Sequence, residues 1–385
     1  MEIGIYLPQI GTGDTAGGYV FIRKILEHVP AEHTIHLHTV EGEFTASFER
    51  ENVDIVSHHR LRDIFPESAH SRVEPRSGSL PQTVESVADA TLELGHSSYN
   101  MAKSKLLGSL GEDSDIIFSQ YVLDTLLLSR LVDTPVVHIF HSLQQVGAGT
   151  KAMLTLEDGV SYVANSDQTR REVERRLGVG VDGIIYPGVD HDEFNPNVGP
   201  AMTTDVPTVL FVGRLTASKG LFDLLTSFAA VERPAHLYIA GQGDTASVER
   251  RIHDLGIDAS VTLLGTVAHD ELPRYYSSCD IFCLPTYYET FGMANLEAMA
   301  CGTPVLTTDI PGVRQYATHD ETSYLVSPGD IDGITQGLDT LISSPELRAR
   351  LGNNGQRTAE RYSWCESANR MVRVSKEILA DSRRD

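Results

Sequence analysis

The sequence predicts an α/β protein built from two doubly wound parallel sheets, one in each half of the chain. Short runs rich in β-branched residues alternate with longer segments of helical spacing, as they do in parallel sheets. The chain has 385 residues, more than one ordinary hydrophobic core contains. A Pro- and Gly-containing break at 194–207 (FNPNVGPAMTTDVP) separates two stretches with the same alternation. These observations predict two domains joined by a linker.

The expected first domain covers residues 1–196 and starts directly with a strand. Helical spacing appears over Tyr19–Glu27 and Thr169–Leu177. A Ser-, Pro- and His-rich segment at 67–98 is expected to be a long loop or an insertion. The expected strands are Ile3–Leu7, Ile35–His38, Asp54–Ser57, Ile116–Ser119, Val136–Phe140, Ser161–Asn165 and Ile184–Tyr186.

The expected second domain covers residues 197–365, and helical content continues through 345–384. Its expected helices are Gly220–Ala230, Ser247–Leu255, Leu272–Ser277 and one that opens near Gly292. Its expected strands are Val209–Val212, His236–Ala240, Val261–Leu264, Ile281–Leu284 and Val305–Thr307. Because doubly wound sheets bind ligands at the carboxyl ends of their strands, we expect the site in a cleft between the two halves.

The formal net charge is −22, and only six of the 31 basic residues are lysines. This acidic surplus suggests a chain kept soluble at high salt, as in halophiles, a hypothesis that predicts higher thermal stability in molar KCl. The same charge argues against nucleic acid as a partner. The four cysteines lack metal-ligand spacing and are expected to be buried, so neither a disulfide framework nor a metal site is expected.

No run of about 18 apolar residues occurs, and the amino-terminal segment MEIGIYLPQI has no basic region that would precede a signal sequence. We therefore expect a cytoplasmic protein with at most peripheral membrane contact. The segment 101–110 carries Lys103 and Lys105, but two charges attract an anionic membrane only weakly. No pattern in the sequence indicates an oligomeric state.

The segment Cys283–Leu306 (CLPTYYETFGMANLEAMACGTPVL) contains two carboxylates around a predicted helix start. Glu289 precedes the helix and Glu297 lies two turns inside it. The first N–H groups of a helix have no intrahelical acceptor and favour anions or hydroxyls. Glu297 has apolar neighbours, so its carboxylate needs a partner if it is buried. An exposed pair of glutamates without a ligand is the alternative interpretation.

Two cations follow the first strand of the second half, in VLFVGRLTASKGL. Arg214 comes after Gly213, and Lys219 follows five residues later. Both leave the carboxyl end of one strand, so they can converge on an anion, with Arg offering a fork and Lys a point charge. Phosphate binding is the favoured interpretation, and a solvated loop pair is the alternative.

Two further candidates lie in the first half. Gly17 and Gly18 precede a helix, where adjacent glycines allow the backbone to approach a diphosphate closely. Their spacing is not the dinucleotide fingerprint, and a flexible loop is an equal alternative. His141, in HIFHS, follows a strand end and points to a cleft, although a structural role is open for a single His there.

These motifs together resemble the retaining glycosyltransferases of family four, which have the GT-B fold. The resemblance rests on VGRLTASKG, followed about 70 residues later by ETFGMANLEAMACGTPV, in which two glutamates are eight positions apart. The order of the other landmarks also fits, from the Gly pair after the first strand through HS, ANSDQTRR, YPGVD and GQG. In that family two Rossmann-like domains face each other, which implies that a helix within 366–385 crosses back to the first domain.

The resemblance implies a role for each charged candidate. Arg214 and Lys219 are similar to the pair that holds the nucleotide diphosphate and stabilises it as leaving group. Glu289 is similar to the carboxylate at the donor sugar, and Glu297 to the ribose ligand. His141 is similar to the histidine near the reacting face of the sugar. The residues expected at the donor through backbone groups are Gly17, Gly18, Gly213, Phe291, Gly292 and Met293.

The resemblance implies a retaining, metal-independent transferase that moves a sugar from a nucleotide-diphosphate sugar to a hydroxyl of a glycan, a lipid-linked molecule or a small molecule. No cofactor is expected besides this donor substrate. One alternative is a sugar-nucleotide 2-epimerase of the same fold. Another is a nucleotide-sugar-binding protein without catalysis, because Pro311 and Gln315 stand where the family usually has Gly and Glu, and Ser323 where it has Gly.

Overall fold

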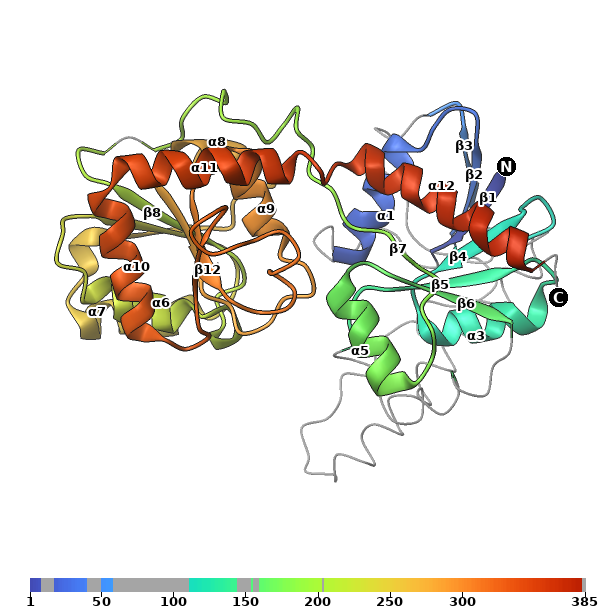
Figure 1. Cartoon of the computed structure of the whole chain (residues 1–385), viewed down its shortest axis with the longest axis horizontal. Helices are drawn as coiled ribbons and strands as arrows, with labels where there is room; N and C mark the ends of the chain where they lie inside the picture. The colour runs from blue at the N-terminus through green and yellow to red at the C-terminus, as the bar shows by residue number, and fades with distance from the viewer. Residues whose placement is uncertain are drawn as a thin grey trace, which may run out of the picture. The chain divides into compact units, whose positions relative to one another are not determined.

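A computed structural model describes residues 1–7, 17–39, 50–57, 111–143, 154, 159–202 and 204–382. The chain forms two compact units (Figure 1). Unit 1 consists of Met1–Tyr186 and Ser367–Asp385, and unit 2 of Pro187–Glu366. The expected loop at 67–98 and the segment 101–110 lie outside the described residues.

Within its described residues, unit 1 contains a seven-stranded parallel sheet in the order β3-β2-β1-β4-β5-β6-β7. The strand order reverses between β1 and β4, which pair directly from Ile3 opposite Ile116. Their carboxyl ends therefore flank the switch point at which doubly wound sheets bind ligands. The strands are β1 (Glu2–Tyr6), β2 (Thr34–Thr39), β3 (Val53–Ser57), β4 (Ile116–Ser119), β5 (Val136–Phe140), β6 (Val160–Ala164) and β7 (Gly183–Ile184).

Four helices accompany this sheet in the described part of unit 1: α1 (Gly17–His28), α3 (Val122–Leu131), α5 (Asp167–Leu177) and most of α12 (Trp364–Asp381). Helices α3 and α5 share a buried apolar cluster with β5 and β6, which includes Leu126, Phe140 and Val173. Helix α5 has a Ser166 cap, whose side chain accepts from the Thr169 amide, and ends at left-handed Gly178.

In unit 2 the described strands form a six-stranded parallel sheet in the order β10-β9-β8-β11-β12-β13. Numbered within the unit this is 3-2-1-4-5-6, the order of Rossmann dinucleotide-binding folds, and the two-sheet α/β prediction is confirmed. The strands are β8 (Thr208–Val212), β9 (His236–Ala240), β10 (Val261–Gly265), β11 (Ile281–Leu284), β12 (Val305–Thr308) and β13 (Tyr324–Val326).

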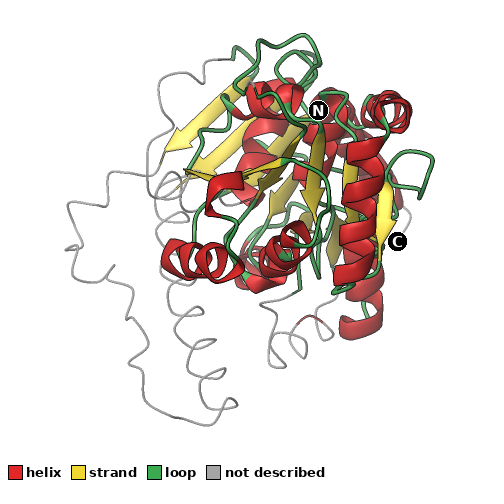
Figure 2. Cartoon of the chain, turned by 90° about the vertical axis from the view of Figure 1, so that its left-hand side faces the viewer, coloured by secondary structure: helices red, strands yellow, loops and turns green. Residues whose placement is uncertain are grey.

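The helices of unit 2 pack in two groups, on opposite faces of its sheet (Figures 1 and 2). Each sheet face is thereby covered, as a parallel sheet requires because its strands are apolar on both sides. One group contains α6 (Leu221–Ala229), α7 (Thr245–Leu255) and α10 (Ile331–Ser343). The other contains α8 (Leu272–Ser278), α9 (Met293–Ala300) and α11 (Pro345–Ala359).

The units divide at Tyr186 and Pro187, ten residues before the boundary expected from the Pro-rich break. The intervening segment belongs to unit 2 because it packs there. Val189 forms a bridge with Ser363, and the buried Phe194 ring lies 5.1 Å from the His269 ring, between centroids. Sequence composition marked the irregular stretch but not the contacts that assign it to one unit.

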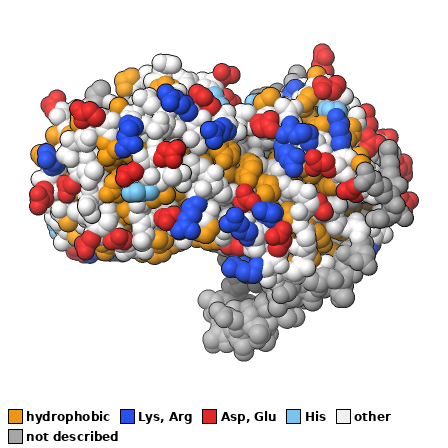
Figure 3. All heavy atoms as spheres, in the orientation of Figure 1, with side chains coloured by type: hydrophobic (Ala, Val, Ile, Leu, Met, Phe, Trp, Pro, Cys, Tyr) orange, Lys and Arg blue, Asp and Glu red, His pale blue; other side chains and the backbone are white. Residues whose placement is uncertain are grey.

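The molecular surface is not uniformly acidic. Lys and Arg side chains lie among acidic ones on the face drawn in Figure 3. Helix α5 alone carries Arg170, Arg171, Arg175 and Arg176. Among the described helices, none combines the length and the apolar character needed to cross a membrane. Three cysteines are buried as expected, whereas Cys365 is exposed because it lies on the outer side of α12 at its first turn.

Candidate functional site

The loops after β8 and β11 hold the candidate residues of unit 2. These strands are neighbours in the sheet, with Val209 opposite Ile281, although about 70 residues separate them in the chain. The loop after β8 contains Arg214 and the 3-10 helix η3 (Ala217–Lys219), and the loop after β11 leads through Glu289 into α9. Both loops start at the switch point of the sheet.

Backbone contacts tie the two loops together. The carbonyl oxygen of Ser218 accepts hydrogen bonds from the amide of Tyr287 at 2.9 Å and from the hydroxyl of Thr286 at 3.2 Å. Gly220 has a φ of +70°, and a Cβ added there would lie 1.9 Å from the carbonyl oxygen of Pro285. Only glycine permits both this backbone conformation and this approach. The loop contacts thereby fix where Lys219 stands relative to Glu289.

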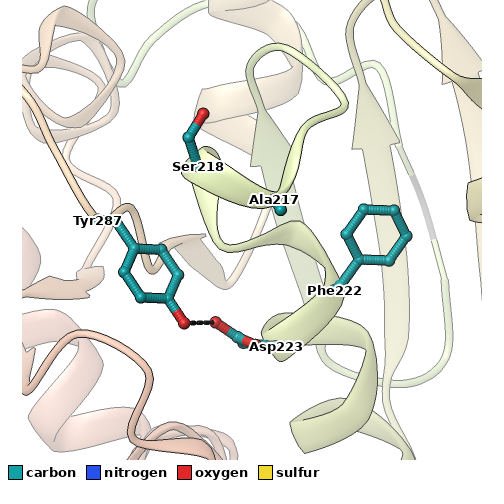
Figure 4. A pocket seen from close by; sticks show the side chains of 5 residues that line it. All are labelled: Ala217, Ser218, Phe222, Asp223 and Tyr287. Carbon is teal, nitrogen blue, oxygen red and sulfur yellow. Dashed lines mark hydrogen bonds between the residues drawn. The ribbon is translucent and has the colours of Figure 1, made fainter.

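A side-chain contact joins the same loops at their outer edge. The Tyr287 hydroxyl donates to Asp223 Oδ2 at 2.6 Å, across a shallow pocket of about 290 Å³ that Ala217, Ser218 and Phe222 also line (Figure 4). The hydrogen bond to Asp223 raises the pKa of Tyr287, so the phenol remains a donor. This hydrogen bond is a third connection between the two loops. It joins the start of α6, which follows η3, to the loop that carries Glu289.

Lys219 and Glu289 form an ion pair in which Lys219 Nζ donates to Glu289 Oε1 at 2.5 Å. The side chains are 20% and 13% exposed, so water screens them only in part. The expectation from the sequence is that Lys219 lies with Arg214 at one anion and that Glu289 lies at the sugar. The structure brings Lys219 and Glu289 together directly.

Arg214 is exposed, and the described part of unit 2 offers it no ion-pair partner. Gly213 precedes it and is placed by two contacts with the next loop. Its amide donates to Ala240, and a Cβ on Gly241 would lie 1.8 Å from the Gly213 carbonyl oxygen. The guanidinium is thus available to an anion beside β8.

Helix α9 begins at Met293, directly after Gly292, which has a φ of +87°. The carbonyl of Gly292 accepts from the buried Tyr316 hydroxyl at 3.1 Å, and Asn295 donates to that same hydroxyl at 3.0 Å. Phe291 is buried, with its ring against that of Tyr316. Because the first helical N–H groups have no intrahelical acceptor, the α9 start is an anchored donor site for hydroxyl or phosphate oxygens.

The loop at 310–315, where the sequence departs from the family pattern, packs behind Glu289. A Cβ on Gly312 would lie 2.0 Å from the Glu289 carbonyl oxygen. The Gln315 amide donates to the carbonyls of Thr290 at 3.3 Å and Gly312 at 3.0 Å. Gln315 therefore supports the backbone beside Glu289 through hydrogen bonds that a Glu could not donate.

Glu297 lies on α9, and its side chain is 9% exposed. Its Oε2 accepts from the hydroxyl of Tyr276 at 3.1 Å, and His269 Nε2 lies 3.0 Å from Oε1. These two side chains are the partners that the apolar surroundings of Glu297 required. The carboxylate still has acceptor capacity, since an ionised carboxylate offers about four lone-pair sites.

In unit 1 the structure brings Gly18 and His141 together. A Cβ on Gly18 would lie 3.4 Å from His141 Cδ2 and 2.7 Å from Gln120 Oε1. The His141 ring packs edge-on against Phe21, with ring centroids 5.0 Å apart. Among the described residues, His141 Nε2 has no hydrogen-bond partner. The absence of a Cβ on Gly18 thus leaves room for the side chains of Gln120 and His141, which directly follow β4 and β5. Gly17 begins α1 beside Gly18.

Comparison with protein families identifies unit 2. Residues 199–358 match the family described as glycosyl transferases group 1. Unit 2 is a group 1 glycosyl transferase domain. A relative named as an uncharacterized glycosyltransferase of Methanocaldococcus jannaschii is 34% identical over 207 residues. That alignment covers 50% of this chain and 53% of the relative, so the chain matches about half of that protein's length.

Solved structures extend the likeness to both units. Sucrose-phosphate synthase from Thermosynechococcus elongatus superposes with a TM-score of 0.74 over 99% of both chains, at 20% identity. Anabaena HepE in complex with UDP-glucose superposes with a TM-score of 0.70, at 17% identity, over 99% of this chain and 100% of that one. At these identities the likeness shows the fold, which is GT-B.

Three side chains beside the candidate residues are not predicted by the sequence patterns. His269 and Tyr276 contact Glu297 from 28 and 21 residues away, and no local pattern announces that contact. Gln120 had a usable signal, because it directly follows β4 at the carboxyl edge of the sheet. The topological rule that led to His141 would have led to Gln120 as well.

Acid is expected to destabilise the protein through His138 and His141 of unit 1. Burial lowers the pKa of His141 from 6.5 to about 4, and burial followed by the neighbouring His141 lowers the pKa of His138 to about 3. Between the folded and unfolded pKa values the unfolded chain binds more protons, so the stabilisation present above pH 6.5 declines as the pH falls. At pH 5 each histidine should cost roughly 2 kcal/mol.

Urea unfolding at pH 7.5 and pH 5.0 measures this effect in the wild type and in His141→Asn. The variant should lose less stability on acidification than the wild type, because it lacks one of the two imidazoles whose pKa is lowered in the folded state. An identical loss in both proteins would show that His141 titrates normally in the folded state.

Proposed function

We propose that the chain transfers a sugar from a nucleoside-diphosphate sugar to an acceptor hydroxyl, with retention of anomeric configuration and without a metal ion. The observation that carries the proposal is the Lys219–Glu289 pair at the switch point of a group 1 glycosyl transferase domain. In this pair a cation lies directly beside a carboxylate, and we assign the cation to the departing diphosphate and the carboxylate to the sugar. The likeness to a chain that binds UDP-glucose supports this class of donor.

In the proposed reaction the bond from the anomeric carbon to the diphosphate oxygen breaks as the acceptor oxygen attacks from the same face. Lys219 and Arg214 stabilise the negative charge that develops on the leaving diphosphate. The diphosphate oxygen takes the proton of the acceptor hydroxyl, so no protein nucleophile is needed. The two cations supply the electrostatic stabilisation that a metal ion supplies in other transferases.

The remaining candidates bind the donor in this proposal. Glu289 accepts from a sugar hydroxyl, and Glu297 accepts from the ribose. The α9 start, from Phe291 to Met293, donates backbone N–H groups to sugar or phosphate oxygens. Gly17 and Gly18 give the diphosphate room at the start of α1, and His141 is assigned to the reacting sugar by the family resemblance.

A donor screen tests the proposal. Thermal unfolding is recorded with each of a panel of nucleoside diphosphates and their sugar conjugates, and a true donor at 100 times its Kd should add about 2.7 kcal/mol of stability. The stabilising donor is then incubated with candidate acceptors, and released diphosphate and product anomers are followed. The proposal requires a product with the anomeric configuration of the donor.

The same assay separates the two alternatives. A 2-epimerase would return an altered sugar or nucleotide sugar without needing an acceptor. A binding protein would be stabilised by a nucleotide sugar and release no diphosphate. If no member of the panel stabilises the protein, the proposed substrate class is wrong.

A further inference from the structure

We infer that Tyr276 and His269 are positioning residues that fix the Glu297 carboxylate for the two ribose hydroxyls of the donor. The inference rests on the proposed function, because it assigns the ligand of Glu297. It goes beyond the proposed function by assigning a role to two side chains that contact this carboxylate and come from a different part of the chain than α9. Helix α8 supplies Tyr276, and the loop before α8 supplies His269.

Tyr276 and His269 contact different oxygens of the Glu297 carboxylate. Tyr276 donates to Oε2 at 3.1 Å, while His269 Nε2 lies 3.0 Å from Oε1. Because an ionised carboxylate only accepts, His269 Nε2 carries the proton in this contact. Each oxygen of the Glu297 carboxylate keeps a free lone pair, so the two oxygens can accept hydrogen bonds from a pair of ligand hydroxyls. The 2′ and 3′ hydroxyls of a ribose form such a pair.

Both positioning side chains are themselves held in place. Tyr276 is fully buried, and its ring lies edge-on to that of Phe282 at 5.3 Å between centroids. Phe194 lies between the two, with its ring centroid 5.1 Å from that of His269 and 6.1 Å from that of Tyr276. Burial and the Glu297 carboxylate raise the pKa of Tyr276 well above its usual value, so its hydroxyl keeps the proton that it donates.

The competing interpretation is that Glu297 merely joins α9 to α8. The two interpretations predict different responses to ribose chemistry. A structural link would weaken every nucleotide equally when it is broken. A positioning role acts only through the ribose hydroxyls, so a nucleotide without them should be insensitive to the loss of Tyr276.

The experiment compares Tyr276→Phe with the wild type by isothermal titration of UDP and of its 2′,3′-dideoxy analogue. The wild type should prefer UDP about 10-fold or more, as for hydrogen bonds to a charged group. In the variant, UDP binding should weaken about 5- to 10-fold while the analogue is nearly unaffected, so the preference collapses. Tyr186→Phe is the matched control, since it removes a hydroxyl that also donates to a carboxylate, Asp167 Oδ2 at 2.7 Å in unit 1.

An unchanged preference in a folded Tyr276→Phe, or an equal loss for both nucleotides, overturns the inference and leaves the proposed function in place. If that variant fails to fold, His269→Ala provides the same comparison, because this side chain is 53% exposed. If the wild type does not bind UDP, the matched GDP and ADP pairs replace it. Failure of all three pairs would overturn the proposed function together with the inference.

Discussion

Replacing Lys219 by alanine is expected to lower kcat for sugar transfer by about 100- to 1000-fold, the usual effect of removing one preorganised group that stabilises transition-state charge. The effect should fall on kcat more than on KM, since negative charge on the diphosphate oxygen grows as the sugar bond breaks. Steady-state rates with the donor found by the screen measure it. Lys376→Ala is the control, because it removes an exposed lysine on α12.

The ion pair complicates this variant, because removing Lys219 also leaves the Glu289 carboxylate without its cation. The double variant Lys219→Ala/Glu289→Gln removes both charges and separates the two effects. It should recover any thermal stability lost by the single variant but not the rate. A single variant with a wild-type kcat would remove Lys219 from the mechanism.

Gly312→Ala is expected to lower the transfer rate about 100-fold, since a displacement of about 1 Å at a reacting group costs that much. The cause is steric. The new Cβ would lie 2.0 Å from the Glu289 carbonyl oxygen, and the backbone of one of the two loops has to move. The φ of Gly312 lies outside the left-handed region, so conformation alone would tolerate alanine.

Gly199→Ala is the matched control for this variant, because an added Cβ there meets no atom within 4 Å. Transfer rates and Tm should be recorded for both. Overpacking typically costs about 1–3 kcal/mol, so Gly312→Ala should remain folded with a lower Tm. Wild-type transfer by Gly312→Ala would show that the Glu289 loop adjusts without consequence for the reaction.

Strands were the part of the fold that sequence predicted best. The ranges for β4, β5, β9 and β11 agree with the structure at both ends, because each is a short, mainly apolar run with a polar or turn residue within two positions of each end. Helix α3 was missed, since VLDTLLLSRL is apolar on nearly all sides and gives no helical period. Strand β13 and helix α10 were not assigned either, and β13 has only three residues.

In the candidate site, too, the sequence predicted some features and not others. Residues within a local motif, such as Glu289, Gly292 and Lys219, could be found because strand, turn and helix signals surround them. The pairing of Lys219 with Glu289 could not, since it depends on β8 and β11 being neighbours in the sheet. The support from Gln315 depends in addition on where a third loop packs, which no spacing in the sequence encodes.

Because helix α12 belongs mostly to unit 1, this unit can be completed only at the end of chain synthesis. The helix residues from Ser367 onward belong to unit 1, where Val374 packs against Gly183 and the Ser367 hydroxyl donates to the Tyr186 carbonyl at 2.6 Å. A ribosome translates all of unit 2 before these residues appear. The half of the protein that is made first therefore completes its core last, and a premature stop near residue 366 would damage the amino-terminal unit.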